Sequence, residues 1–270
     1  MFEALNHHQL EKLAPSIFGA GGSDKTSDKY SHISTVQVID AIAREGFLPV
    51  YAGQSRSRLP GKIDFAKHVI RFRHQDSIAT NSGLHPELVL TNSHDGLSSY
   101  KLQSGLFRMV CSNGMVTGET FRQVNVRHTG DVIGNVIEGV YEIVQESEKI
   151  LDAAESMRAL ELTTDERQVF AKSVHQLYFG DEESNNRTAI TPEKFLRVRR
   201  GADRGQDLFT TLNITQENVI RGGLSGYYID EHKQYRKTST RAIASIDRNN
   251  TLNRALWTLA EEMAKLKGAA

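Results

Sequence analysis

Apolar residues in the first third of the chain change their spacing from helical to alternating, and this change constrains the fold more than any other feature. Val36, Ile39 and Ile42 recur at three-residue steps, which is the spacing of one helix face. Ser34 opens the pattern with the spacing of a capping box, and Gly46 is suited to end a helix. The pattern predicts a short helix over residues 34–45.

The residues after this helix alternate with a period of two. In the segment HVIRFR, His68, Ile70 and Phe72 share one face, and Arg71 and Arg73 share the other. Similar segments, LPVYA and ELVLTN, precede and follow it and are bounded by turn-forming Pro-Gly and Asp-Gly pairs. We expect three antiparallel strands over residues 47–92, and hence an α+β fold in which helices pack an antiparallel sheet.

Helical spacing dominates the remainder of the chain. Apolar residues from Val136 to Met157 predict one long or two consecutive amphipathic helices. Capping patterns at Thr163 and Thr191 predict two more helix starts, and the second opens the basic helix FLRVRR. A leucine stripe predicts a last helix from about Asn250. We expect this stripe to dock on the chain's own core, with the seam of a homo-oligomer as the alternative.

These patterns divide the chain into three predicted parts. Residues 1–30 contain the stretch GAGGSDKTSDK and are expected to form a flexible N-terminal arm. Residues 31–133 are expected to form the α+β sheet core, and residues 134–270 a mainly helical C-terminal region. Within the core, the pattern of GLFRMVCSNGMVTG fits either a strand or a buried helix.

Composition narrows the classes of function. The single cysteine, Cys111, excludes an internal disulfide and any multi-cysteine metal site, and it suits a reducing cytoplasm. Neither an N-terminal signal pattern nor a membrane-spanning apolar run is present, so we expect a cytoplasmic protein that does not act at a membrane. Basic and acidic residues number 33 each, so any affinity for phosphate must come from local segregation of charge.

Charges are indeed sorted along the sequence. Basic residues outnumber acidic ones by six to one in residues 51–73 and by thirteen to seven in residues 187–254, whereas residues 138–183 hold four basic and twelve acidic residues. Aromatic residues such as Tyr51, Tyr227, Tyr228 and Tyr235 are interspersed among the cations, which is typical of grooves that bind single strands. The alternative is a solvated surface neutralised by the chain's own acidic helices. The candidate nucleic-acid-binding residues are Arg56, Arg58, Lys62, Lys67, Arg71, Arg73, Arg197, Arg199, Arg200, Arg221, Arg236, Lys237 and Arg241.

Two polar turns provide the best candidates for catalysis. His94 and Asp95 lie in TNSHDG, and His128 and Asp131 lie in VRHTGD. If the turns met in space, these side chains would suit a divalent cation and a metal-dependent nuclease. The same residue types are ordinary in turns, and no other cluster resembles a catalytic centre. We therefore expect a binding protein without metal or cofactor.

The chain resembles a family of bacterial, phage and plasmid proteins catalogued as domain of unknown function 932, often named phage/plasmid-like proteins. The resemblance runs from about Tyr30 to Lys267 and rests on four strings: TNSHDGLSSYKLQSGLFRMVCSNGMV, VRHTGD, NITQENVIRGGL and SIDRNNTLNRALWTLAEEMAKLK. It implies a mobile-element or prophage protein of the bacterial cytoplasm. It assigns neither an activity nor functional residues.

The N-terminal third is similar in layout to the core of Rad-fifty-two-type single-strand annealing proteins. In that family a tyrosine-bearing strand leads to a helix and an antiparallel hairpin, and basic residues of the hairpin hold single-stranded DNA within a ring of subunits. No later segment of this chain supplies the rest of that core. The resemblance matches Tyr30 and Ile33 before the helix, Val38-Ile39 on it, Gly46-Phe47 at the turn, and Arg56, Arg58, Lys67, Arg71 and Arg73 in the hairpin.

Together these patterns predict a protein that binds single-stranded DNA in the recombination, replication or maintenance of a mobile element. Two alternatives stay open. One is the metal-dependent nuclease. The other is a protein-interaction module that inhibits a host defence enzyme, with the acidic helices between Glu138 and Glu183 mimicking the charge of DNA.

Overall fold

The computed structural model describes residues 3–19, 21, 33–55, 63–77, 83–95, 98–108, 115–116, 123–180 and 189–268. The chain forms two compact units, Met1–Thr117 with Phe121–Leu151 and Gly118–Thr120 with Asp152–Ala270. The division falls within helix α4 (Ser147–Arg158). Among the helices of these described ranges, none combines the length and apolar character needed to cross a membrane.

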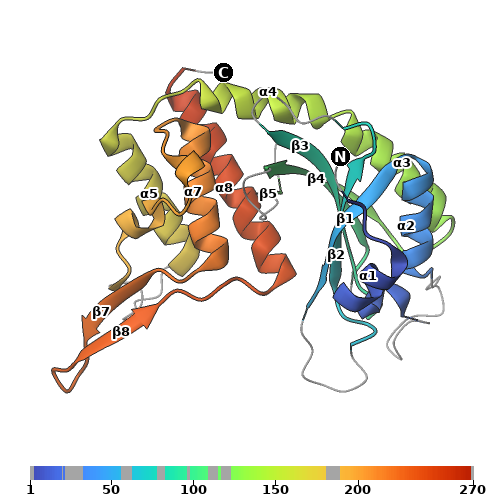
Figure 1. Cartoon of the computed structure of the whole chain (residues 1–270), viewed down its shortest axis with the longest axis horizontal. Coiled ribbons are helices and arrows are strands. Elements are labelled where there is room, and N and C mark those ends of the chain that lie inside the picture. The colour runs from blue at the N-terminus through green and yellow to red at the C-terminus, as the bar shows by residue number, and fades with distance from the viewer. Residues whose placement is uncertain are drawn as a thin grey trace. The chain divides into compact units, whose positions relative to one another are not determined.

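An antiparallel sheet forms the centre of the first unit (Figure 1). Strands β1 (Phe47–Gln54), β2 (His68–His74), β3 (Leu84–Asn92) and β4 (Tyr100–Arg108) pair in chain order, and β4 also pairs with β5 (Met115–Val116) and β6 (Gln123–Val126). The predicted α+β class and the three strands over residues 47–92 are confirmed. The ambiguous segment that begins at Gly105 starts as part of β4.

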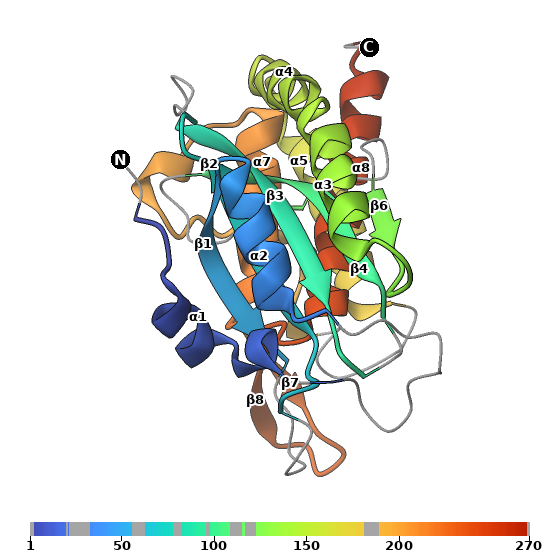
Figure 2. The same ribbon diagram turned by 90° about the vertical axis from the view of Figure 1, so that its right-hand side faces the viewer.

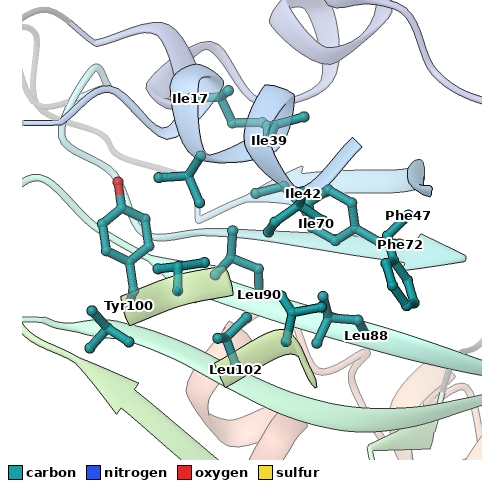
Figure 3. Close-up of a cluster of buried hydrophobic side chains, with 14 of the residues drawn as sticks. Ile17, Ile39, Ile42, Phe47, Ile70, Phe72, Leu88, Leu90, Tyr100 and Leu102 are labelled. Atoms are coloured by element: carbon teal, nitrogen blue, oxygen red, sulfur yellow. The ribbon is translucent and has the colours of Figure 1, made fainter. Parts of the chain in front are cut away.

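Two helices, α2 (Thr35–Arg44) and α3 (Val132–Val144), cover one face of this sheet (Figure 2). Ile39 and Ile42 of α2 belong to the same buried cluster as Ile70 and Phe72 of β2 (Figure 3). Burial of each such side chain stabilises the fold by about 1.5–3 kcal/mol. The predicted helix over residues 34–45 and the inward face of β2 are therefore confirmed. The capping box predicted at Ser34 is not formed, because Ser34 Oγ donates to the backbone oxygen of Ile17 at 3.3 Å.

The N-terminal segment differs from the expected flexible arm. Asn6 and Gln9 form a capping box that starts α1 (His7–Leu13), and a 3-10 helix, η1 (Pro15–Phe18), follows it. Leu10 and Ile17 are buried in the core of the first unit. Helical spacing of these apolar residues outweighs the glycine-rich composition that follows them. The glycine-rich stretch itself, at residue 20 and residues 22–32, lies outside the described residues.

The second unit contains helices α5 (Thr164–Phe179), α7 (Leu208–Arg221) and α8 (Ile246–Leu266) and a two-stranded sheet of β7 (Ser225–Ile229) and β8 (Tyr235–Ser239). Residues 208–219 of α7 are buried, including several polar side chains. These find partners inside the unit, as where Gln216 Nε2 donates to Asn253 Oδ1 on α8 at 3.0 Å. The capping box at Thr163 is confirmed, and the pattern from residue 136 to residue 157 forms two helices, α3 and α4.

The predicted basic helix FLRVRR is replaced by a shorter element. The 3-10 helix η2 (Pro192–Leu196) ends before the arginines, and Arg197 has an extended backbone. Asn218 of α7 explains the difference, because its Nδ2 donates to the backbone oxygens of Phe195 and Arg197 at 2.8 and 2.9 Å. A buried tertiary partner thus satisfies the carbonyl groups that a continued helix would have satisfied itself.

Gly222 lets two parts of the second unit approach closely. It ends α7 with φ 62°, and a Cβ atom added there would lie 2.5 Å from the carbonyl carbon of Arg241. Its neighbour Gly223 also has a positive φ, 75°, but a Cβ atom added there meets nothing within 4 Å. The two glycines therefore share the same backbone restriction, and only Gly222 adds a packing restriction.

We predict that Gly222→Ala destabilises the second unit more than Gly223→Ala. The Gly223 variant loses only the ease of a positive φ, which costs about 1 kcal/mol, whereas the Gly222 variant must also displace the backbone at Arg241 and costs about 2–3 kcal/mol. Urea unfolding of both variants measures the two free energies. Equal losses of stability would contradict the close approach at Gly222.

Candidate nucleic-acid interface

One carboxylate contacts both arginines of strand β2. Arg71 and Arg73 share a face of β2, as alternation predicts, and Glu87 on the neighbouring strand β3 contacts both. The Glu87 oxygens lie 2.7 Å from Arg73 Nη2 and 3.4 Å from Arg71 Nε. The Arg71 guanidinium also lies over the ring of Tyr51, 4.5 Å from its centroid.

These charges stabilise the fold by pairing with one another. Glu87 and Arg73 are buried, and burial raises the pKa of the Glu87 carboxyl, although the charges of Arg71 and Arg73 act to lower it. Removing one partner of a buried ion pair typically destabilises a protein by about 3–5 kcal/mol. Contact of these arginines with a phosphate in place of Glu87 would therefore destabilise the first unit. The structure corrects the expectation of uncompensated cations on this strand. Among the other members of the cluster, Lys67 precedes β2, and Arg56, Arg58 and Lys62 lie outside the described residues.

Three arginines of the second predicted cluster are likewise bound within their own unit. Arg200 donates to both oxygens of Glu217, at 2.8–3.2 Å, and Arg221 Nη1 lies 3.2 Å from the same carboxylate. Arg199 donates to Asn218 Oδ1 at 2.6 Å and to the backbone oxygen of Gly222. Glu217 and Asn218 are both buried in α7. These contacts hold the segment after η2 against α7 and leave the three arginines little freedom to bind a ligand.

The other predicted cations of the second unit lie on or near the β7–β8 hairpin. Arg236 pairs with Asp230 in the turn at 2.8 Å. Arg197, Lys237 and Arg241 are exposed, and none of the three forms an ion pair with any residue that the structure describes. The hairpin projects away from α5 and α7 (Figure 1). Of these three cations, Lys237 lies on β8 and Arg241 lies two residues after it.

The two faces of this hairpin differ sharply. Gly226 lies on the inner face, where an added Cβ atom would stand 2.0 Å from the backbone oxygen of Ala189. Lys194 Nζ joins the two segments by donating to the oxygens of Ser225 and Ala189, at 2.6 and 3.2 Å. The inner face is therefore fixed to the body of the second unit.

The outer face presents aromatic and apolar side chains to solvent. Tyr227 pairs across the hairpin with Lys237, and Ile229 pairs with Tyr235. Tyr227 is 65% exposed, Ile229 57% and Tyr235 79%. Side chains of this size are usually at least partly buried, and clustered exposure marks interaction surfaces. The sequence shows these tyrosines among the cations. Their shared face was not predicted, because the region after residue 134 was expected to be mainly helical.

The turns proposed as a metal site meet at a buried hydrogen-bond network in the first unit. The rings of His94 and His128 are 6.2 Å apart, and His68 lies 5.6 Å from His94. Thr35 Oγ1 links His68 Nε2, His94 Nε2 and Asn92 Nδ2, at 2.9, 3.0 and 3.2 Å. The sequence pattern placed His68 on this inward face and Asn92 in the polar turn TNSHDG, but it gave no signal for the role of Thr35.

The contacts of His68 indicate which of its ring nitrogens carries the proton. Its Nδ1 lies 2.9 Å from Ser16 Oγ, which can accept or donate, and 3.1 Å from the backbone oxygen of Ala66, which can only accept, so Nδ1 carries the proton and Nε2 accepts from Thr35. His94 Nε2 must then donate to Thr35, and His128 Nε2 donates to Asn92 Oδ1 at 2.9 Å. Burial lowers the pKa of His68 to about 4. The described part of this site is a hydrogen-bond network that joins α2 to strands β2 and β3 and to the loops that hold His94 and His128.

The two aspartates of the proposed metal site serve local turns instead. Asp95 accepts from Ser93 Oγ at 2.6 Å, and Asp131 caps α3 by accepting from Gly134 N at 2.9 Å. Across the ranges that the structure describes, no three His, Cys, Asp or Glu side chains are arranged to hold a metal ion. The four residues therefore do not form the carboxylate-rich site that metal-dependent hydrolysis requires.

We predict that the stability of the first unit falls as the pH drops from about 6.5 toward 4. The folded state resists protonation of His68, whose pKa is lowered to about 4, whereas the unfolded chain accepts a proton near the ordinary value of 6.5. The free energy of unfolding should fall by at most about 1.4 kcal/mol per pH unit in this window. Urea unfolding from pH 7 to pH 5 measures it. His68→Gln should reduce the change of unfolding free energy with pH, and the control His8→Gln, at an exposed site, should leave it unchanged. Equal slopes of unfolding free energy against pH in the two variants would contradict the buried neutral state of His68.

Comparison with known proteins places the chain in a family without assigning it a reaction. The model of the family described as Domain of unknown function (DUF932) matches residues 24–257. The UPF0380 proteins YafZ and YfjQ of Escherichia coli (strain K12) are each 39% identical over 259 residues, which cover 96% of this chain and 91% of the relative. No solved structure matches, and these comparisons do not support the likeness to single-strand annealing proteins. The chain belongs to the DUF932 family.

Proposed function

We propose that this protein binds single-stranded nucleic acid, DNA in the first instance, through the outer face of the β7–β8 hairpin. The observation that carries the proposal is the exposure of Tyr227 and Tyr235 beside Lys237 on one face of an anchored two-stranded ribbon. Stacking of a base on an exposed aromatic side chain contributes about 1–3 kcal/mol. This face therefore offers stacking surfaces and a cation at neighbouring positions.

The charge around the hairpin favours a polyanion. Lys233 and Lys237 are exposed on it, and Arg241 lies two residues after β8. Asp230 is occupied, because it accepts from Arg236 and from the backbone nitrogens of His232 and Gln234 in the turn. Asp230 thus shapes the turn, whereas the second acidic residue, Glu231, is exposed and lies 3.8 Å from His232 Nε2. Contacts from lysine and arginine to phosphates supply the sequence-independent part of nucleic-acid affinity.

The aromatic face favours unpaired strands over a duplex. Bases in a duplex are stacked on one another, so a tyrosine ring can stack on a base only where the strand is open. Because the bacterial family that the chain resembles is associated with phages and plasmids, we assign this binding to recombination, replication or maintenance of a mobile element. Binding of the hairpin to a protein instead of a strand is the outcome that the following test separates.

We predict that Tyr227→Ala/Tyr235→Ala weakens binding to a labelled oligothymidylate of about 20 nucleotides by about thirtyfold, which corresponds to about 1 kcal/mol lost at each ring. Fluorescence anisotropy at fixed salt measures both affinities. Tyr141→Ala is the matched control, since Tyr141 is an exposed tyrosine on α3 of the first unit. A duplex of the same length should bind less tightly than the single strand.

Two results would contradict the proposal. One is an affinity in the double variant equal to that of wild type and of Tyr141→Ala. The other is an absence of binding by the wild-type protein at low salt, where electrostatic contacts are strongest.

A further inference from the structure

A pocket at the base of the hairpin carries two arginines without an opposing carboxylate. It has a volume of about 610 Å³ and lies where the chain passes from β8 to α8. No Asp or Glu is among the described residues that line it. Its principal lining residues are Tyr178, Ser239, Arg241, Ala244, Ser245 and Arg248.

The backbone beneath this pocket is held in place from two sides. Gly223 N donates to Thr240 O at 2.8 Å, and Ile243 N donates to Ile220 O at 2.9 Å. Tyr178 of α5 closes another side, because its hydroxyl donates to the backbone oxygen of Arg241 at 3.1 Å. A pocket formed in this way needs little ordering when a ligand binds, and so loses little affinity to conformational entropy.

The guanidiniums of Arg241 and Arg248 are available to pair with an anionic ligand. Arg248 Nη2 donates to the backbone oxygen of Tyr178 at 3.1 Å, and its guanidinium lies 5.8 Å from the centre of that ring. Arg241 uses its backbone oxygen, and neither side chain forms an ion pair with a described residue. Burial raises the pKa of Tyr178, while the charges of Arg248 and Arg241 act to lower it. Both cations are therefore close enough to act on the same ring.

We propose that this pocket binds a phosphodiester group of the strand whose bases stack on the hairpin, an inference that rests on the proposed function. Guanidiniums suit phosphate because their planar N–H groups match its oxygens in pairs. The pocket also continues the outer face, since Tyr235, Lys237 and Ser239 alternate along β8 and Arg241 follows two residues later. At a strand rise of about 3.3 Å per residue, Arg241 lies about 13 Å from Lys237 along this path.

The test removes the cations separately and uses two ligands. Arg241→Gln and Arg248→Gln are compared with Arg204→Gln, which alters an exposed arginine of the same unit outside the pocket. The ligands are a labelled oligothymidylate and the same oligomer with an uncharged methylphosphonate backbone. Each pocket variant should bind the charged oligomer about three- to tenfold less tightly and reduce the slope of log affinity against log salt by about 0.7. Neither should change binding of the uncharged oligomer.

The outcomes separate this inference from the proposed function. Pocket variants that match Arg204→Gln in affinity and salt slope, while Tyr227→Ala/Tyr235→Ala still weakens binding, would overturn the phosphate site and leave the hairpin as the binding surface. Failure of wild-type protein to bind either oligomer would overturn both. Arg241→Gln keeps the test decisive if Arg248→Gln disturbs folding, because the Arg241 side chain makes no hydrogen bond with described residues.

Discussion

Two buried carboxylates, Glu87 and Glu217, hold four of the predicted cations in contacts within the fold. Glu87 contacts Arg71 and Arg73 in the first unit, and Glu217 contacts Arg200 and Arg221 in the second. A buried carboxylate that lost such partners would destabilise its unit by several kcal/mol. These arginines therefore keep their contacts with the carboxylates. The local surpluses of positive charge in the sequence thus include cations that stabilise the fold. Among the described residues, Lys237 on β8 and Arg241 after it form no ion pair and can contact a ligand.

The hairpin combines anchoring and exposure in a way that suits binding. Its inner face is fixed by the close approach at Gly226 and by Lys194, whereas its outer face leaves Tyr227 and Tyr235 in solvent. A ribbon fixed on one side presents its aromatic rings in a defined geometry, which lowers the entropy lost when a ligand is bound. The buried histidine network has the opposite character, because its described residues are shielded from solvent and hold α2 to the sheet.

Much of the fold was predictable because it depends on local periodicity. Helix α2, strands β1 to β3 and the capping box at Thr163 follow from patterns within ten or so residues. The errors arise where a distant residue decides. Asn218 of α7 ends η2, and Glu87 lies on a different strand from Arg71, outside residues 51–73. The charge of a short segment does not reveal a cross-strand partner. The sequence therefore predicts that cations and tyrosines occur together, but not which of them the fold leaves exposed. Membership of the DUF932 family supplies no residue roles that would have corrected this.

The most direct test is to map where a strand touches the protein. Photo-crosslinking of the full chain to a single-stranded oligonucleotide that carries 5-iododeoxyuridine, followed by mass spectrometry of the crosslinked peptides, identifies the residues against which the bases lie. Crosslinks at Tyr227 and Tyr235 are the expected result. Crosslinks confined to the sheet of the first unit, or a hairpin left unmodified while other segments react, would contradict the assignment of the binding surface to this hairpin.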